Sequence, residues 1–133
     1  MTTCAVKILL DTCTFLWIAL DPSRLGERAS AFILDENNEL YLSAASAWEI
    51  GIKYASGRLL LSQRPEVFIP KAREANAIAT LDVNEESGLH AGRLPPLHAD
   101  PFDRMLVAQA IIHGMTVLTP DPLIERYGVC VLW

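Results

Sequence analysis

The sequence predicts an α/β fold in three layers, with a central parallel sheet of about four to five short strands and helices on both faces. Short apolar runs alternate with helical patterns along the whole chain, which is typical of parallel strands joined by helices. The first run, VKILL at residues 6–10, is largely apolar, as expected of a central strand buried on both faces. The 133 residues are enough for one domain and too few for two, so we expect a single domain over residues 1–133.

The first half of the chain alternates strands and helices with clear boundaries. An Asp-Pro pair at 21–22 ends a mostly apolar helical segment, and an Asn-Asn pair at 37–38 ends the next one. Ser43 is a suitable N-cap for a helix that runs to about Ala55. The elements expected here are a strand at 6–10, helices at 12–20 and 26–36, a strand at 39–42 and the helix that follows Ser43.

The second half repeats this alternation after an irregular stretch at residues 59–65. Asn84 is a suitable N-cap for one helix, and the Pro-Pro pair at 95–96 marks a loop. Asp103 opens an almost wholly apolar helix that covers residues 105–112. The elements expected here are a helix at 66–76, a strand at 77–81, helices at 84–92 and from Asp103, a strand at 115–118, a short helix at 120–127 and a terminal strand at 129–132.

Composition is that of a globular protein, because hydrophobic residues make up 51% of the chain. The three cysteines are odd in number and form no CxxC motif, which indicates a reducing compartment and neither a disulfide framework nor a zinc knuckle. The start of the chain lacks the apolar core of a signal peptide, and the apolar run at 15–20 is too short to span a bilayer. We expect a soluble, cytoplasmic protein without a membrane partner. The cysteines are Cys4, Cys13 and Cys130.

The net charge of −5 by itself speaks against a nucleic-acid-binding protein. Its distribution along the chain weakens that argument, because five basic residues are clustered with a single acid, Glu66, among them. Either a basic rim beside an acidic pocket or an ordinary solvated surface would account for this cluster. The basic residues are Lys53, Arg58, Arg64, Lys71 and Arg73.

Acidic residues follow predicted strands or begin predicted helices at several places. Asp11 comes directly after the first strand, Asp103 opens the apolar helix, and Asp121 comes three residues after the strand at 115–118. Because ligands bind outside the carboxyl ends of parallel strands, we expect these side chains to share one crevice at that edge of the sheet. A crevice lined by several carboxylates suits a hard cation such as Mg²⁺ or Mn²⁺.

Each acid also has a structural explanation. Asp11 and Asp100 could be N-caps, and Thr119 could cap a helix that has Asp121 in its first turn. Glu49 could form a solvated ion pair with the lysine four residues later. Capping alone is sufficient for Asp100, which precedes a proline, but it does not explain why the acids should converge at one edge of the sheet.

Other chemistries have little support in the sequence. The three histidines are widely spaced and form no HxxxH pair, so we do not expect a zinc site. The sequence has no GxSxG motif and no glycine-rich phosphate loop. Cys13 lacks the basic surroundings of a reactive thiolate. The histidines are His90, His98 and His113.

Four segments resemble the PIN-domain family, and among its members the VapC-type toxins of bacterial and archaeal toxin–antitoxin pairs. The DPFDRMLVAQA segment is specific, whereas the LLDT start and the T-x-D end are weak alone and strong in combination. The segments follow the order and spacing of the family over nearly the whole chain. They are LLDTCTFLW at 9–17, SAASAWEIGIK at 43–53, DPFDRMLVAQA at 100–110 and LTPD at 118–121.

The resemblance implies a three-layer PIN-like fold and a metal-dependent endoribonuclease that hydrolyses RNA phosphodiester bonds with Mg²⁺ or Mn²⁺. Motif by motif, the four catalytic and metal-binding acids of the family fall on Asp11, Glu49, Asp103 and Asp121. Three further residues are expected to support the site, and one of them, Asp100, is either a helix cap or a site residue. They are Thr119, which matches a Thr or Ser of the family, the additional acid Asp100, and Thr12 of the LLDT motif.

Partners also follow from the resemblance. Such toxins are neutralised by a cognate VapB-like antitoxin and usually form homodimers. The antitoxin typically places a helix in an apolar groove. The helical pair at residues 12–36 carries more apolar surface than one helix face needs, and part of it could form this groove.

Two other classes of function remain open at this point. A phosphotransfer enzyme, either a phosphatase or a receiver-like domain, also carries acids at strand ends. A phosphatase of the haloacid dehalogenase type would need an acid where Cys13 stands, and a receiver would have to use Asp82. The second class is a non-catalytic interaction module on the same fold, and the intact set of four acids argues against it.

Overall fold

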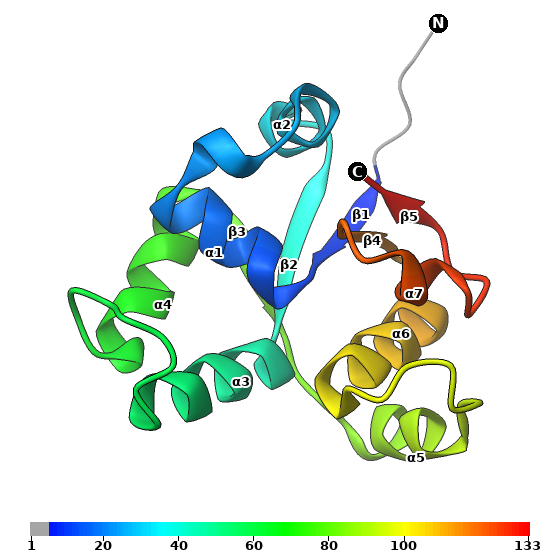
Figure 1. Cartoon of the computed structure of the whole chain (residues 1–133). Helices are drawn as coiled ribbons and strands as arrows, with labels where there is room; N and C mark the ends of the chain where they lie inside the picture. The colour runs from blue at the N-terminus through cyan, green and yellow to red at the C-terminus, as the bar shows by residue number, and fades with distance from the viewer. Residues whose placement is uncertain (1–5) are drawn as a thin grey trace, which may run out of the picture.

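The structure, a computed structural model, describes residues 6–133, so Cys4 lies outside the described residues. Five parallel strands form one sheet in the order β3-β2-β1-β4-β5 (Figure 1). The predicted α/β fold with a parallel sheet is therefore confirmed. The strands are β1 (Lys7–Leu10), β2 (Glu39–Ser43), β3 (Ile78–Leu81), β4 (Thr116–Leu118) and β5 (Val131–Leu132).

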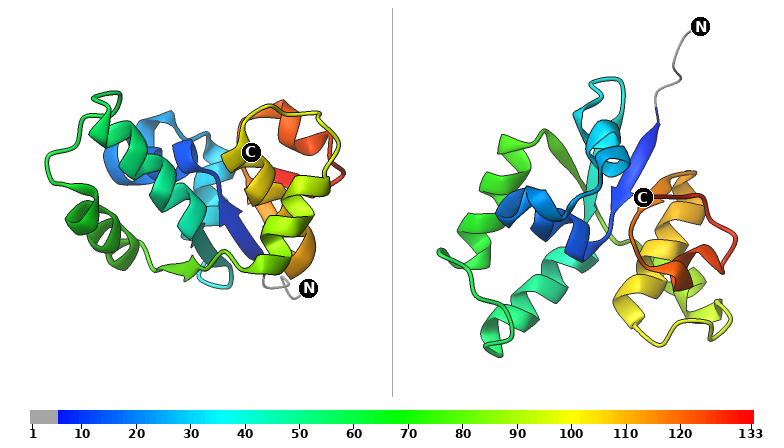
Figure 2. Two further views of the ribbon diagram at one scale, coloured as in Figure 1. Left: turned by 90° about the horizontal axis from the view of Figure 1, so that it is seen from below. Right: turned by 45° about the horizontal axis from the view of Figure 1, so that its top comes forward.

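Helices lie on both faces of this sheet and give the three predicted layers (Figures 1 and 2). Successive side chains of a strand point to opposite faces, so Ile8 and Leu10 pack into one core and Leu9 into the other. No helix of residues 6–133 is long and apolar enough to cross a membrane. The first core is covered by α1 (Thr12–Leu20), α2 (Glu27–Leu34), α3 (Ala44–Ala55) and α4 (Pro65–Ala75), and the second by α6 (Pro101–His113) and α7 (Pro122–Glu125), with α5 (Glu85–Arg93) packed against α6.

The predicted elements are all present, and the differences lie at their ends. Ala77 does not belong to β3 as expected, because its φ of 53° is a left-handed conformation that a strand does not contain. Helix α6 begins at Pro101, as the Asp-Pro cap predicts, and ends at His113, where Gly114 with a φ of 63° is the C-cap. A short 3₁₀ helix at Pro22–Arg24 occupies the place where the sequence indicated only the end of a helix.

Strands β1 and β4 end level with each other and β2 ends one residue later, and this register positions the side chains of the candidate site. Leu10 at the end of β1 pairs with Leu42 on one side and with Leu118 on the other. The residues that follow the β1 and β4 pair, Asp11 and Thr119, therefore emerge side by side at the carboxyl edge of the sheet. The backbone N–H of Asp11 donates to the carbonyl of Leu118 at 3.3 Å, which extends the pairing into the loop.

Candidate metal centre

Asp11 lies between β1 and α1 and is almost completely buried, with 5% of its surface exposed. Its Oδ1 accepts a hydrogen bond of 2.7 Å from the N–H of Thr14, so Asp11 is the N-cap of α1. Its Oδ2 accepts a hydrogen bond from the hydroxyl of Thr119 at the end of β4. The structural and the functional explanations of this acid are therefore compatible, because one oxygen caps the helix and the other faces the neighbouring strand end.

Thr119 connects Asp11 to Asp121. Its hydroxyl donates to Asp11 and accepts from the backbone N–H of Asp121 at 3.1 Å. The predicted role of Thr119 as a helix cap was wrong, because the side chain of Asp121 itself accepts from the N–H of Leu123 at 2.9 Å and Pro122 begins α7. This shift of the cap by two residues shortens α7 and leaves the Thr119 side chain free to orient the two acids.

Glu49 comes from the middle of α3 and is buried, with 6% of its surface exposed. Its Oε1 accepts a hydrogen bond of 2.7 Å from the hydroxyl of Thr12, and its Oε2 lies 2.6 Å from Nζ of Lys53. The ion pair expected from the helix pattern is present, but its acid is not solvated. The contact with Thr12 holds α3 against the start of α1 and directs Glu49 toward the carboxyl edge of the sheet.

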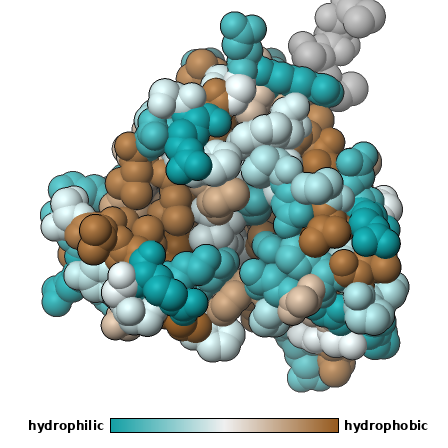
Figure 3. Space-filling view, in the orientation of Figure 1, coloured by the Kyte–Doolittle hydropathy of each residue, from teal (hydrophilic) through white to brown (hydrophobic). Residues whose placement is uncertain are grey.

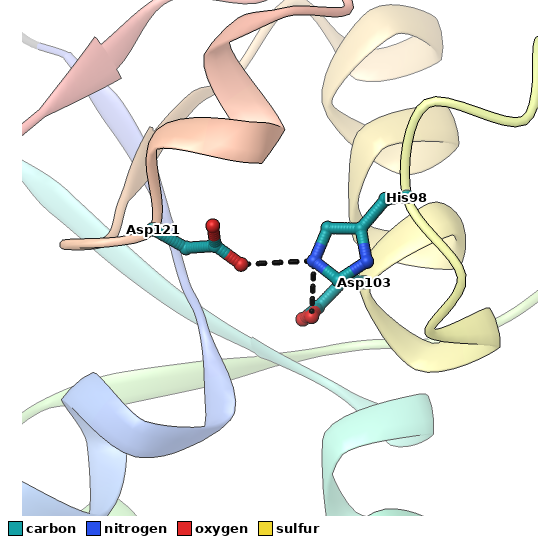
Figure 4. Close-up of side chains that lie close together, drawn as sticks. All are labelled: His98, Asp103 and Asp121. Atoms are coloured by element: carbon teal, nitrogen blue, oxygen red, sulfur yellow. Dashed lines mark hydrogen bonds and ion pairs between the residues drawn. The ribbon is translucent and has the colours of Figure 1, made fainter.

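His98 is the residue that the sequence analysis did not place in the site. Its Nε2 lies 2.8 Å from Oδ2 of Asp121 and 3.1 Å from Oδ2 of Asp103, between the two carboxylates (Figure 4). The three side chains place their ligand atoms within 4.8 Å of one another. The wide spacing of the three histidines does not indicate this place; the signal in the sequence is the position of His98 two residues before the Asp100 cap.

Asp103 lies in the first turn of α6, and its pKa depends on the surrounding acids. Its pKa is raised from 3.8 to about 7, first by burial and next by repulsion from the charge of Asp100. The charges of Asp11 and Glu49 contribute to this rise, and the ring of His98 opposes it. The predicted acids therefore act on one another electrostatically, although their roles as metal ligands and catalytic residues stay predictions.

Asp100 is the N-cap of α6, because its Oδ1 accepts from the N–H of Phe102 at 2.9 Å. It also lines an open cleft of about 430 Å³ together with Glu49, Lys53 and Arg58. The cap expected from the Asp-Pro sequence is confirmed. The charge of Asp100 also affects the site, because it raises the pKa of Asp103.

The donor set fits a hard divalent cation. Carboxylate oxygens are the ligands that Mg²⁺ and Mn²⁺ prefer, and a cation would relieve the repulsion that raises the pKa of Asp103. Cys13 does not compete as a soft ligand, because burial and the charge of Asp11 raise the pKa of its thiol to about 12. The receiver alternative loses its support, since Asp82 is exposed and follows the edge strand β3.

Comparisons with known proteins agree with the fold. The model of the PIN domain family matches residues 8–129. Ribonuclease VapC22 of Mycobacterium tuberculosis is 29% identical over 115 residues, which cover 86% of each chain. In the structure of VapBC2 from Rickettsia felis bound to a DNA fragment from its promoter, one chain matches with a TM-score of 0.72 and 13% identity, over 96% of this chain and 98% of that one. FitAcB from Neisseria gonorrhoeae matches with a TM-score of 0.61 and 24% identity, over 95% of this chain and 96% of the other.

Replacing Asp100 with serine separates its cap from its charge. A serine hydroxyl can accept from the N–H of Phe102, so the melting temperature of Asp100→Ser should match that of the wild type, while Asp100→Ala should lose about 1 kcal/mol. The pKa of Asp103, followed by NMR titration of its carboxyl carbon, should fall in both variants because the nearby charge is gone. An unchanged pKa in both would show that Asp100 does not act on the site.

The raised pKa of Asp103 predicts how the stability of the metal-free protein depends on pH. Above the ordinary value of 3.8 the unfolded chain loses the Asp103 proton, whereas the folded protein keeps it up to about pH 7. The contribution of Asp103 to the free energy of unfolding is therefore complete below pH 4 and declines up to about pH 7.

Urea denaturation in EDTA at several pH values, with Asp103→Asn as the reference, measures this effect. Asparagine mimics the protonated acid, so the stability of the variant relative to wild type should increase between pH 4 and 7, by at most roughly 1.4 kcal/mol per pH unit, and level off above. A difference that is independent of pH over this range would contradict the raised pKa.

Proposed function

Since the chain belongs to the PIN domain family, we propose that it is a metal-dependent endoribonuclease that hydrolyses RNA phosphodiester bonds and acts as the toxin of a toxin–antitoxin pair. The observation that carries this proposal is the group of acids around Asp103. Asp11 and Glu49 raise its pKa, and His98 bridges it to Asp121. The ribonuclease activity named for the VapC22 relative supports RNA as the substrate.

The proposed cofactor is Mg²⁺ or Mn²⁺. When bound, the cation would neutralise charge on the phosphate and make a water molecule more nucleophilic. The protein contributes the orientation of the carboxylates: Thr119 orients one aspartate, and Thr12 orients the glutamate. Release of the Asp103 proton on metal loading would couple metal affinity to pH. The proposed metal-binding and catalytic residues are Asp11, Glu49, Asp103 and Asp121.

Two basic residues support a path for the RNA backbone. Lys53 and Arg58 line the same cleft as Glu49 and Asp100, although they belong to a chain with a net charge of −5. Cationic side chains next to a metal centre would attract the phosphates on either side of the bond to be cleaved. For Lys53 and Arg58, this arrangement favours the first of the two interpretations of the basic cluster, a basic rim beside an acidic pocket.

The proposed antitoxin partner has a candidate groove at the opposite end of α1. Hydrophobic side chains gather over α1 and α4 on the face shown in Figure 3. Two adjoining hollows of about 230 and 260 Å³, which share Asn76, lie there. One is lined by Ala19 and Phe68, the other by Leu25 and Ile33, so an amphipathic helix could place its apolar face across both.

We also propose a homodimer and a cytoplasmic location, where the RNA substrate is found. An apolar hollow of about 370 Å³ next to Trp48 supports self-association, because 66% of this large side chain is exposed. Phe102 packs edge-on against it, with ring centroids 5.3 Å apart. Burial of such a surface against a second copy would be favourable.

Removal of single acids tests the proposed activity. Purified protein should cleave single-stranded RNA in Mg²⁺ or Mn²⁺ and lose this activity in EDTA. Asp11→Asn and Asp103→Asn should each lower the cleavage rate by about a hundredfold or more, because loss of a ligand costs at least as much as loss of its supporting contacts. Asp82→Asn, which removes an exposed acid, is the matched control and should cleave like the wild type. Equal rates in all three variants would refute the assignment.

Binding of the cation should also stabilise the folded protein. A free Mg²⁺ or Mn²⁺ concentration of a hundred times the dissociation constant would add about 2.7 kcal/mol to the free energy of unfolding, and the melting temperature should rise by several degrees. NaCl at the same ionic strength controls for general screening. A melting temperature that responds equally to both salts would contradict a specific metal site.

A further inference from the structure

We propose that His98 is a positioning residue of the metal centre and not one of its ligands: its Nε2–H donates to Asp121, the same atom lies against Asp103, and the ring thereby sets the spacing of these two carboxylates. This inference rests on the proposed metal-dependent function, and it concerns a residue outside the four acids of that proposal. His98 comes from the loop that connects α5 to α6, whereas the two acids come from the starts of α6 and α7.

The hydrogen bonds around the ring determine which nitrogen carries the proton. The backbone N–H of Asp100 donates to Nδ1 of His98 at 3.1 Å, so Nδ1 is an acceptor and carries no proton in this arrangement. The ring proton is therefore on Nε2, the atom that lies 2.8 Å from Asp121 and 3.1 Å from Asp103. The ring thus donates a hydrogen bond to Asp121 and lies in contact with Asp103, two acids from different helices.

The backbone of His98 is held in place independently of its ring. Its N–H donates to the hydroxyl of Tyr127 at 2.9 Å, and this hydroxyl donates in turn to the carbonyl of Pro95 at 2.8 Å. The side chain is 11% exposed. These contacts tie the loop before α6 to the segment after α7, so the ring is presented to the acids by a rigid support.

The same hydrogen bonds argue against ligation of the metal by His98. A histidine that binds a metal through one nitrogen donates its other ring N–H to an acceptor. Here the other nitrogen, Nδ1, faces the N–H donor of Asp100. Ligation through Nε2 would require a proton on Nδ1 and would break that contact. The close group of His98, Asp103 and Asp121 is therefore two candidate ligands and the side chain that holds them.

Two substitutions of His98 test the roles of its two ring nitrogens separately. In His98→Gln the amide N–H can still reach the carboxylates from the position of Nε2. In His98→Asn the amide oxygen can still accept from Asp100, but the side chain is too short to reach the two acids. Dissociation constants for Mn²⁺ and Mg²⁺ are measured by calorimetry on the purified full chain, together with the melting temperature of each variant in EDTA.

The positioning role of His98 predicts that His98→Asn binds the cation about ten- to a hundredfold more weakly than wild type, as is usual for loss of a side chain that orients a ligand. His98→Gln should bind within about threefold of wild type, because the donor is retained. Equal affinities of wild type and His98→Asn would overturn the positioning role. A wild type that binds neither cation would refute the metal site itself and hence the proposed function, which is a distinct result.

The tautomer gives a readout that does not depend on catalysis. ¹⁵N-detected NMR of the His98 ring in the full chain should show the proton on Nε2, both in EDTA and in saturating Mg²⁺. A purely structural histidine would not require this tautomer to persist when the carboxylates bind the cation. A proton on Nδ1 in the Mg²⁺-loaded protein would identify His98 as a ligand and overturn the inference.

Discussion

Negative charge gathered at the carboxyl edge of the parallel sheet is the constraint on which the rest of the site depends. Carboxylates that are buried close together repel, and each needs a donor or a cation to remain ionised. Neighbouring elements supply hydrogen-bond donors to three of the acids. Asp11 accepts from the Thr14 amide and from Thr119, and Glu49 accepts from Thr12 and Lys53. Asp121 accepts from the Leu123 amide and from His98. Among the contacts of residues 6–133, the side chain of Asp103 accepts no hydrogen bond and has only the His98 ring at 3.1 Å, and Asp103 is the acid whose pKa rises to about 7.

The sheet and the positions of most acids could be predicted because they depend on local signals. Apolar runs that alternate with helical patterns define the strands, and a strand end followed by a helix start brings an acid to the same edge wherever it occurs. Capping does not exclude a place in the site, as Asp11 and Asp121 illustrate. A carboxylate has two oxygens, and in each case Oδ1 caps a helix while Oδ2 points to another part of the site.

The features that the sequence could not supply all depend on contacts between distant segments. A helix pattern cannot distinguish a solvated Glu49 from a buried one, because its burial is decided by the contact of α3 with Thr12 on α1. The role of His98 depends on a loop that Tyr127 holds from 29 residues away along the chain. The contact of the Thr119 hydroxyl with Asp11 likewise depends on the register of β1 and β4, which brings two segments far apart in the chain side by side.

The two sides of the site, at Glu49 and at Asp103, differ in the positive charge and the donors that surround the acid. Glu49 already has a full positive charge at 2.6 Å in Lys53, whose side chain is 41% exposed and can move into the cleft. On the other side, Asp103 has only the contact with the His98 ring among the polar contacts that the structure describes, and its pKa is raised to about 7. A cation bound beside Asp103 would displace its proton and favour its charged form, whereas Lys53 would have to leave Glu49 for that acid to bind a cation. Asp103, the acid with the weakest polar contacts in the metal-free protein, is thus the one whose environment a cation would change most.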